Sequence, residues 1–229
     1  MEFVFQEKLI TLAEFDDEDD FLLSLINQLP TRSRVIEVGA FRGKFSKPIL
    51  ERFEKALIIE GEETNYLGLV RSFPLHEKKI IHKQIYKDNG IHNWFFKKDC
   101  GLNAIRIPMG RKLNNAHMSK KKVNTITLDE IDFDFDFIKT DCEGSDFPIL
   151  QGAIKLIDRN RPLIYFEHTG EMGALNHKYT KDDFFTFFSE RKYKLCFTNG
   201  SEFTRSMWYT DTHNTFNSYN ILAIPKEFL

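Results

Sequence analysis

The sequence predicts an α/β protein whose core is a doubly wound, mostly parallel sheet with helices on both faces. Short apolar runs of strand length alternate with helical patterns along most of the chain. The first apolar run passes directly into a turn with two glycines and then into a helix, in the stretch "VIEVGAFRGKFS". Near the C-terminus two strand-like runs follow one another without an obvious helix between them, which predicts an antiparallel pair at one sheet edge.

The expected elements follow from the apolar runs and the residues that interrupt them. A first helix ends at Pro30, because proline cannot continue a helix. The last helix presents a broad stripe of phenylalanines, which we assign to the core. The pattern predicts seven strands, at 35–38, 56–60, 79–86, 135–140, 161–167, 193–198 and 219–225, and helices at 18–29, 44–53, 64–73, 146–158 and 181–191.

The length and composition suit one folding unit. The chain has 229 residues, and 41% of them are hydrophobic, enough for a substantial core. We expect a helical lead-in over residues 1–32 and one globular domain over 33–229. There is no internal repeat and no low-complexity linker.

Charge and cysteine content limit the expected partners and compartment. The net charge of −2 gives no electrostatic indication of a nucleic-acid partner, and the cluster Lys120–Lys122 is interpreted as a solvated loop. No apolar run has the length of a membrane span, and the N-terminus lacks the pattern of a secretory signal. The cysteines are odd in number and widely spaced, which favours a reducing cytoplasm over a disulfide framework; they are Cys100, Cys142 and Cys196.

The glycine turn predicts a nucleotide-type cofactor site. In an open α/β sheet, ligands bind beyond the carboxyl ends of the strands, so the turn from Gly39 to Gly43 should line the site. The second strand ends in Glu60, near the offset at which an acidic residue binds ribose hydroxyls. The turn lacks the G-x-G-x-x-G order of a dinucleotide site, and Glu37 precedes it. A carboxylate disfavours a pyrophosphate and favours a sulfonium, which indicates S-adenosylmethionine.

Three stretches resemble the FkbM family of S-adenosylmethionine-dependent methyltransferases, which are class I, Rossmann-like enzymes. They are "VIEVGAFRGKFS", "IIEGEE" and, most specifically, "TLDEIDFDFDFIKTDCEGSDFPILQGAIKLIDRNRPLIYFE". The similarity covers roughly residues 33–167, and the closing "YNILAIP" is also typical. The chain departs from the family pattern at Glu37, where aspartate is commoner, at Phe41, where asparagine is commoner, and at Cys142, which replaces an aliphatic residue.

The resemblance implies a set of cofactor contacts. Around the methionine part of S-adenosylmethionine it places Glu37, Gly39, Ala40 and Gly43. It assigns Glu60 to the ribose. From their position at the end of the third predicted strand, Gln84 and Ile85 are expected to flank the adenine.

Three polar residues at strand ends are the candidates for catalysis. Asp141 and Glu143 follow the fourth predicted strand, so either can face the acceptor and take its proton. Glu143 can equally cap the next helix. His168 follows the fifth predicted strand and can supply an imidazole base, or it can be a polar strand tip. The same three side chains could ligate a divalent ion, but no ligand motif requires one, and we predict no metal site.

Two longer segments are expected to form the substrate wall. Residues 88–122 include Arg111 and His117, and residues 198–217 include Trp208, Tyr209 and His213. In "DFDFDF", at 132–137, we assign the phenylalanines to the core and the aspartates to solvent.

The sequence therefore predicts an S-adenosylmethionine-dependent methyltransferase that acts on oxygen of a small molecule or a glycan. One alternative is an NAD(P)-dependent oxidoreductase or epimerase, disfavoured by the missing third glycine. The other is a non-catalytic module that keeps the cofactor fold for partner binding, and Phe41 in the glycine turn supports it best.

Overall fold

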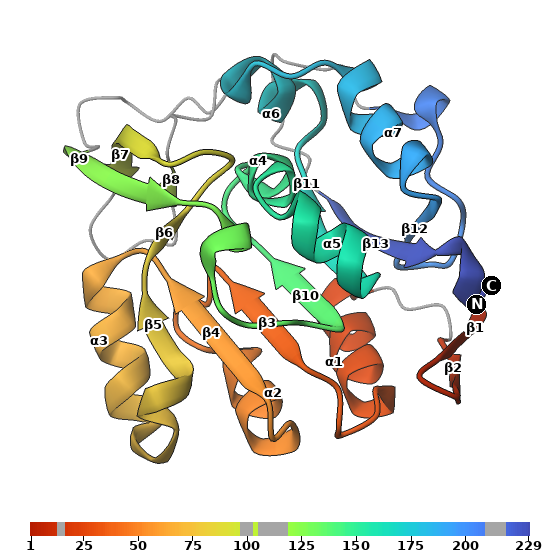
Figure 1. Ribbon diagram of the computed structural model, residues 1–229, viewed down its shortest axis with the longest axis horizontal. Helices are drawn as coiled ribbons and strands as arrows, with labels where there is room; N and C mark the ends of the chain where they lie inside the picture. Colours follow the sequence, from red (N-terminus) through yellow and green to blue (C-terminus); the bar gives the residue numbers. More distant parts are fainter. Residues whose placement is uncertain (13–16, 97–102, 105–118, 209–218) are drawn as a thin grey trace.

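The computed structural model describes residues 1–12, 17–96, 103–104, 119–208 and 219–229, and its centre is a seven-stranded sheet (Figure 1). The strand order is β12-β13-β11-β10-β3-β4-β5, and every neighbouring pair is parallel except the two pairs that involve β13. The predicted antiparallel C-terminal strand is thus confirmed. The strands are β3 (Val35–Val38), β4 (Ala56–Glu60), β5 (Ile80–His82), β10 (Phe137–Thr140), β11 (Leu163–His168), β12 (Tyr193–Phe197) and β13 (Tyr219–Pro225).

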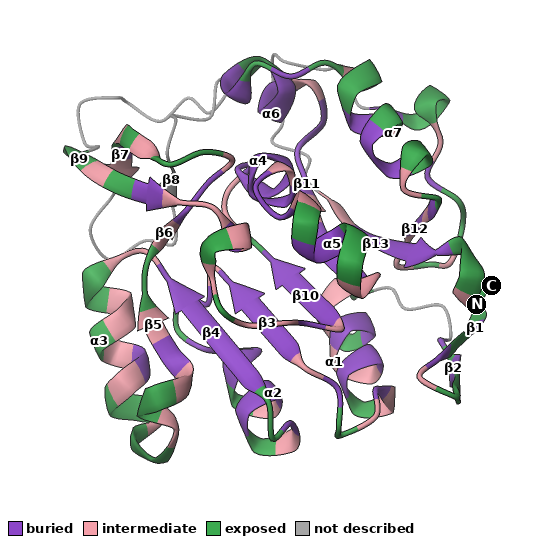
Figure 2. Cartoon of the chain, in the orientation of Figure 1, coloured by how far each residue is buried: buried purple, intermediate pink, exposed green. Residues whose placement is uncertain are grey.

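Helices cover both faces of this sheet, as a doubly wound fold requires. One face packs against α1 (Glu18–Gln28), α2 (Ser46–Arg52) and α3 (Glu63–Ser72), and the other against α4 (Asp146–Gln151), α5 (Ile154–Asn160) and α7 (Lys181–Glu190). Side chains of β3 and β4 alternate between the two resulting cores. The central strands are accordingly buried along their whole length (Figure 2).

A second, four-stranded sheet is inserted between β5 and β10. Its order is β6-β9-β7-β8, and Figure 1 shows it beyond the carboxyl ends of β4 and β5. The prediction of one continuous strand over 79–86 was wrong, because the chain leaves the main sheet after His82 and joins the small sheet at Gln84. Its strands are β6 (Gln84–Ile85), β7 (Gly90–Phe96), β8 (Asn103–Ala104) and β9 (Ser119–Ile126).

Three other elements differ from the sequence prediction. The expected helix over 146–158 is broken at Gly152, where a Cβ atom would collide with the carbonyl oxygen of Tyr86. A short helix, α6 (Gly170–His177), follows β11. The first 32 residues contain a hairpin of β1 (Glu2–Phe5) and β2 (Lys8–Thr11) as well as α1. The Phe3 side chain of this hairpin is buried in the core.

Asp132 of "DFDFDF" is exposed, as expected, whereas Asp134 and Asp136 are only partly solvated. Phe135 and Phe137 are buried, as expected. Asp136, however, receives a bidentate contact from Arg34, whose Nε lies 3.0 Å from Oδ2 and whose Nη2 lies 2.6 Å from Oδ1. Asp134 also pairs with Arg34, at 3.2 Å. These carboxylates therefore tie the start of β10 to the residue that precedes β3.

The phenylalanine stripe of α7 provides a test of the packing. Phe184 is fully buried, whereas Phe185 is half-buried on the same helix. We expect Phe184→Ala to lower the free energy of unfolding by about 3–5 kcal/mol, because it removes a large buried ring and leaves a cavity. Phe185→Ala is the matched control and should cost less than half as much in urea denaturation. Equal losses in the two variants would contradict this core assignment.

Candidate active site

A cleft opens at the carboxyl ends of β3, β4 and β10, where the small sheet faces the main sheet. Its empty volume is about 730 Å³, part of which is open to solvent. The cleft is lined by Val38, Gly39, Phe41, Ile59, Glu60, Gly61, Asn65, Lys83, Gln84, Ile85, Trp94, Asp141, Cys142, Glu143, Ser145 and Ile149.

Gly39 is required by a close approach between two strand ends. Its φ is +81°, and a Cβ atom there would collide with the carbonyl oxygen of Asp141 and lie 2.8 Å from the Cys142 Sγ atom. A side chain at this position would therefore push the two strand ends apart. Gly43, with φ of +82°, has a different role, because a Cβ there would meet Leu69 and Phe73 at 2.8 Å.

The predicted cofactor residues in the glycine turn thus divide into two groups. Gly39 lines the cleft, whereas Gly43 packs toward α3 and is not among the lining residues. Ala40 is also outside the lining and belongs to the core. Phe41 takes a φ of +50°, a conformation that asparagine adopts more readily than a phenylalanine. The backbone geometry of the turn therefore accounts for asparagine being the commoner residue in the pattern.

Glu60 closes the wall of the cleft next to this turn. Its side chain is buried, and its two carboxylate oxygens accept the backbone N–H groups of Phe41 at 2.7 Å and Glu62 at 2.8 Å. Burial raises the pKa of Glu60, while these two backbone hydrogen bonds oppose the rise. A carboxylate oxygen can accept more than one hydrogen bond, so Glu60 is oriented by the backbone and can still bind two ligand hydroxyls.

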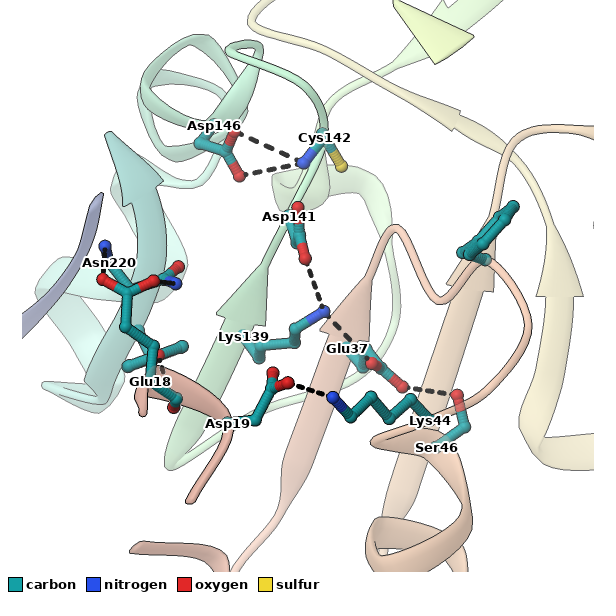
Figure 3. A network of polar contacts seen from close by, with 12 residues as sticks. Glu18, Asp19, Glu37, Lys44, Ser46, Lys139, Asp141, Cys142, Asp146 and Asn220 are labelled. Atoms are coloured by element: carbon teal, nitrogen blue, oxygen red, sulfur yellow. Dashed lines mark hydrogen bonds and ion pairs between the residues drawn. The ribbon is translucent and has the colours of Figure 1, made fainter. Parts of the chain in front are cut away.

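Glu37 lies beneath the cleft and not in its lining (Figure 3). Its fully buried carboxylate accepts the Ser46 hydroxyl at 2.6 Å and pairs with the Lys139 ammonium at 3.4 Å. Burial raises the pKa of Glu37, and the Lys139 charge opposes that rise. The expectation that Glu37 lies beside the cofactor is therefore not supported by the geometry, because its carboxylate is used inside the sheet.

Lys139 contacts both this buried carboxylate and a carboxylate that lines the cleft. Its Nζ atom also lies 3.4 Å from Oδ2 of Asp141, which lines the cleft and whose side chain is 48% exposed (Figure 3). Burial opposes the ammonium charge, but the carboxylates of Asp141 and Glu37 raise the pKa of Lys139 above its ordinary value. Lys139 therefore stays charged and restrains Asp141 at the mouth of the site. The sequence analysis did not single out Lys139.

The two residues expected near an adenine do line the cleft, but from the small sheet. Gln84 and Ile85 form β6, and Gln84 Nε2 donates to the carbonyl oxygen of Gly61 after β4. Trp94 of β7 completes this wall. No sequence signal pointed to it, because it lies in a segment expected to be irregular. With Ile59 these side chains offer the apolar surface that an aromatic base needs.

The turn after β10 carries the remaining candidates. Glu143 lines the cleft with a φ of +54°, and Gly144 follows it with a φ of +86°. Asp146, which the sequence analysis overlooked, is buried behind this turn and accepts the backbone N–H of Cys142 at 3.2 Å. The carboxylate of Asp146 thus fixes the shape of the turn that presents Asp141 and Glu143.

His168 is surrounded by aromatic side chains and does not line the cleft. It is 1% exposed, is absent from the cleft lining, and its ring lies among the rings of Phe184, Phe203, Trp208 and Tyr219 at centroid distances of 4.7–5.4 Å. Burial lowers the pKa of His168 to about 3. This environment suits a neutral core imidazole and does not favour the predicted catalytic base.

Other sequence expectations fall partly outside the described residues. Arg111, His117, Tyr209 and His213 lie there, whereas Trp208 is buried and its indole N–H donates to Glu171 at 2.9 Å. Across the described ranges, no three His, Cys, Asp or Glu side chains are grouped so as to hold a metal ion. Among the helices of the described chain, none combines the length and apolar character needed to cross a membrane.

Asp146 provides a pH test of the turn. Burial, followed by the charge of Asp141, raises its pKa from 3.8 to about 7. The folded protein therefore holds this proton more tightly than the unfolded chain, so the stability it contributes is full below about pH 4 and is lost as the pH rises through about 7. We expect the stability of Asp146→Asn, relative to the wild type, to increase between pH 5 and pH 8 in urea denaturation. A pH-independent difference would contradict the assignment.

Comparison with known proteins gives the family. The model of the methyltransferase FkbM domain matches residues 12–195. No curated protein is significantly similar in sequence. Among solved structures, a methyltransferase FkbM from Methylobacillus flagellatus KT aligns with a TM-score of 0.50 and 17% identity, over 86% of this chain and 45% of that one. A precorrin-6y C5,15-methyltransferase from Geobacter metallireducens GS-15 aligns with a TM-score of 0.45 and 12% identity, over 94% of both chains.

These comparisons agree with the architecture described above. The sheet is Rossmann-like, as in the FkbM structure that it resembles, and the chain spans less than half the length of that structure. The matched range includes the glycine turn, Glu60 and the turn after β10. The chain therefore belongs to the FkbM methyltransferase family.

Proposed function

We propose that this protein uses S-adenosylmethionine to methylate a hydroxyl group of a small molecule or a glycan. The observation that carries the proposal is the position of Glu60, a buried carboxylate that faces the cleft and is held by two backbone N–H groups. A carboxylate so placed at the end of the second strand suits a ribose with two hydroxyls. The family assignment supports the same reading.

The charges of the side chains that line the cleft suit this cofactor. S-adenosylmethionine supplies a methyl group bonded to a positively charged sulfur. Three carboxylates, those of Glu60, Asp141 and Glu143, line the cleft and favour a cation. A dinucleotide would bring a negatively charged pyrophosphate to the same carboxylates, so the geometry disfavours the NAD(P) alternative.

In this proposal Asp141 acts on the acceptor. Its side chain is half exposed at the cleft, so an acceptor hydroxyl can reach it, and Lys139 holds Oδ2 from beneath. A carboxylate oxygen of Asp141 accepts the hydroxyl proton as the oxygen attacks the methyl carbon. Methyl transfer otherwise depends on alignment and on the exclusion of water. Glu143 is the second candidate for contact with the acceptor.

Cofactor binding can be measured without knowing the acceptor. At about 100 times its dissociation constant, S-adenosylmethionine should stabilise the wild type by about 2.7 kcal/mol, a shift of a few degrees in thermal unfolding, and NAD should give no shift. Glu60→Gln should abolish the shift, because an amide cannot accept two hydroxyl hydrogen bonds as a carboxylate does. Glu63→Gln, at an exposed site on α3, is the control and should keep it. A shift with NAD alone would refute the proposal.

The role of Asp141 requires a turnover measurement. A screen of sugars, lipids and peptides, with demethylated cofactor as the detected product, identifies an acceptor. Asp141→Asn should then lower kcat about 10²–10⁴-fold, because the amide cannot take the hydroxyl proton. The thermal shift with S-adenosylmethionine should be unchanged in this variant. Unchanged kcat would remove Asp141 from the chemistry.

A further inference from the structure

The overall net charge hides a strong separation of charge along the chain. Residues 83–127 contain eight lysines and two arginines against two aspartates and no glutamate, a net charge of +8. Because the whole chain carries −2, the remaining 184 residues carry −10. An asymmetry of this size indicates an anionic ligand for the basic segment.

The described part of this segment forms one wall of the cleft. It builds the small sheet, and four of its residues line the cleft, namely Lys83, Gln84, Ile85 and Trp94. Within the described residues the segment has five lysines and one aspartate, Asp88, which pairs with His92 at 2.7 Å. The basic segment is therefore adjacent to the proposed reaction site.

One of three consecutive lysines of β9 shares a face of the small sheet with Trp94, and the other two lie on the opposite face. In the register of β7 and β9, Lys120 pairs with Phe95, Lys121 with Trp94 and Lys122 with Asn93. Directly paired side chains lie about 5 Å apart on the same face of a sheet. Lys121 therefore lies on the face of the sheet that carries Trp94. All three lysines are exposed.

Trp94 adds a donor to this wall. Its side chain is 8% exposed, and its indole Nε1 atom is buried without a hydrogen-bond partner among the residues that the structure describes. A buried N–H without an acceptor is costly unless a ligand supplies one. Trp94 and Lys83 both line the cleft, so an oxygen-rich ligand there would meet this N–H group and the Lys83 ammonium.

The cofactor, whose sulfonium and ammonium outweigh its one carboxylate, does not account for a segment with a net charge of +8. Its sulfonium is positive, and the carboxylates of Glu60, Asp141 and Glu143 already suit it. Lysines would repel it. We propose that the acceptor is an anionic glycan, whose phosphate or carboxylate groups are bound by Lys83, just before β6, and by Lys121 of β9. This inference rests on the proposed function and specifies its substrate class.

Equilibrium binding tests the inference. The probes are fluorescein-labelled tetragalacturonate, phosphorylated mannopentaose, neutral maltotetraose and a uridine tetranucleotide, measured by anisotropy at low and high salt. We expect at least one anionic glycan to bind more tightly than maltotetraose, with affinity falling as salt rises. The first two probes distinguish carboxylate from phosphate. The proposal would be overturned if neither anionic glycan bound more tightly than maltotetraose. It would also be overturned if the tetranucleotide bound more tightly than both anionic glycans.

Matched variants locate the binding surface. The triple variant Lys120→Gln, Lys121→Gln, Lys122→Gln should weaken the glycan affinity about 10-fold, because it removes the Lys121 contact and two neighbouring positive charges. The control triple variant Lys8→Gln, Lys55→Gln, Lys78→Gln changes the net charge equally at exposed sites outside the small sheet and should stay within about twofold of the wild type. Equal weakening in both would mean non-specific attraction and would overturn the site.

The thermal shift with S-adenosylmethionine separates this inference from the proposed function. The β9 triple variant should keep the shift. If the wild type shows the shift but binds no anionic glycan, only the inferred acceptor class fails. If the wild type shows no shift, the proposed function itself fails, whatever the glycans do.

Discussion

The two central strands approach so closely at their carboxyl ends that no side chain fits between them. At Gly39 even a Cβ atom would collide with the carbonyl oxygen of Asp141. The strand register also places Lys139 opposite Glu37 across the same two strands. The glycine turn and the turn that carries Asp141 are therefore not independent parts, and a change that separates them would displace both sides of the cleft. The depth of the site follows from this backbone contact.

The second constraint is electrostatic and explains which acidic residue lines the cleft. Glu37 and Glu60 are both buried acids at the ends of central strands, and their sequence positions predicted the same kind of role. The structure separates them by their partners: Glu37 faces the Lys139 ammonium, whereas Glu60 faces backbone N–H groups. Removing Lys139 would leave a buried charge without its counterion, which is costly. Sequence alone could not assign Glu37, because its partner lies on a strand 100 residues away.

The fold was predictable for strands that are buried on both faces, because such strands appear in the sequence as continuous apolar runs. The strands at 35–38 and 56–60 were predicted to the residue, because both their faces are buried. The N-terminal hairpin was missed because Gln6 and Glu7 adopt positive φ without the glycine or asparagine that usually marks such a turn. The break at Gly152 depends on a distant carbonyl, which periodicity cannot detect. His168 is enclosed by rings from later elements, so its sequence position did not distinguish a base from a core residue.

The separation of charge gives the cleft two chemically different walls. Glu60, Asp141 and Glu143 belong to the ends of the main sheet, and the lysines of the small sheet stand on the opposite side. A cation and an anion brought into one such cleft are each attracted by a different wall, and they also attract one another. The electrostatic field of these two walls would thus favour the alignment of a sulfonium with an anionic acceptor. The same field would keep each ligand out of the position that the other occupies. Net charge fails as a guide here because the acidic and basic residues cancel in the sum, although the anionic groups of the acceptor would meet only the basic ones.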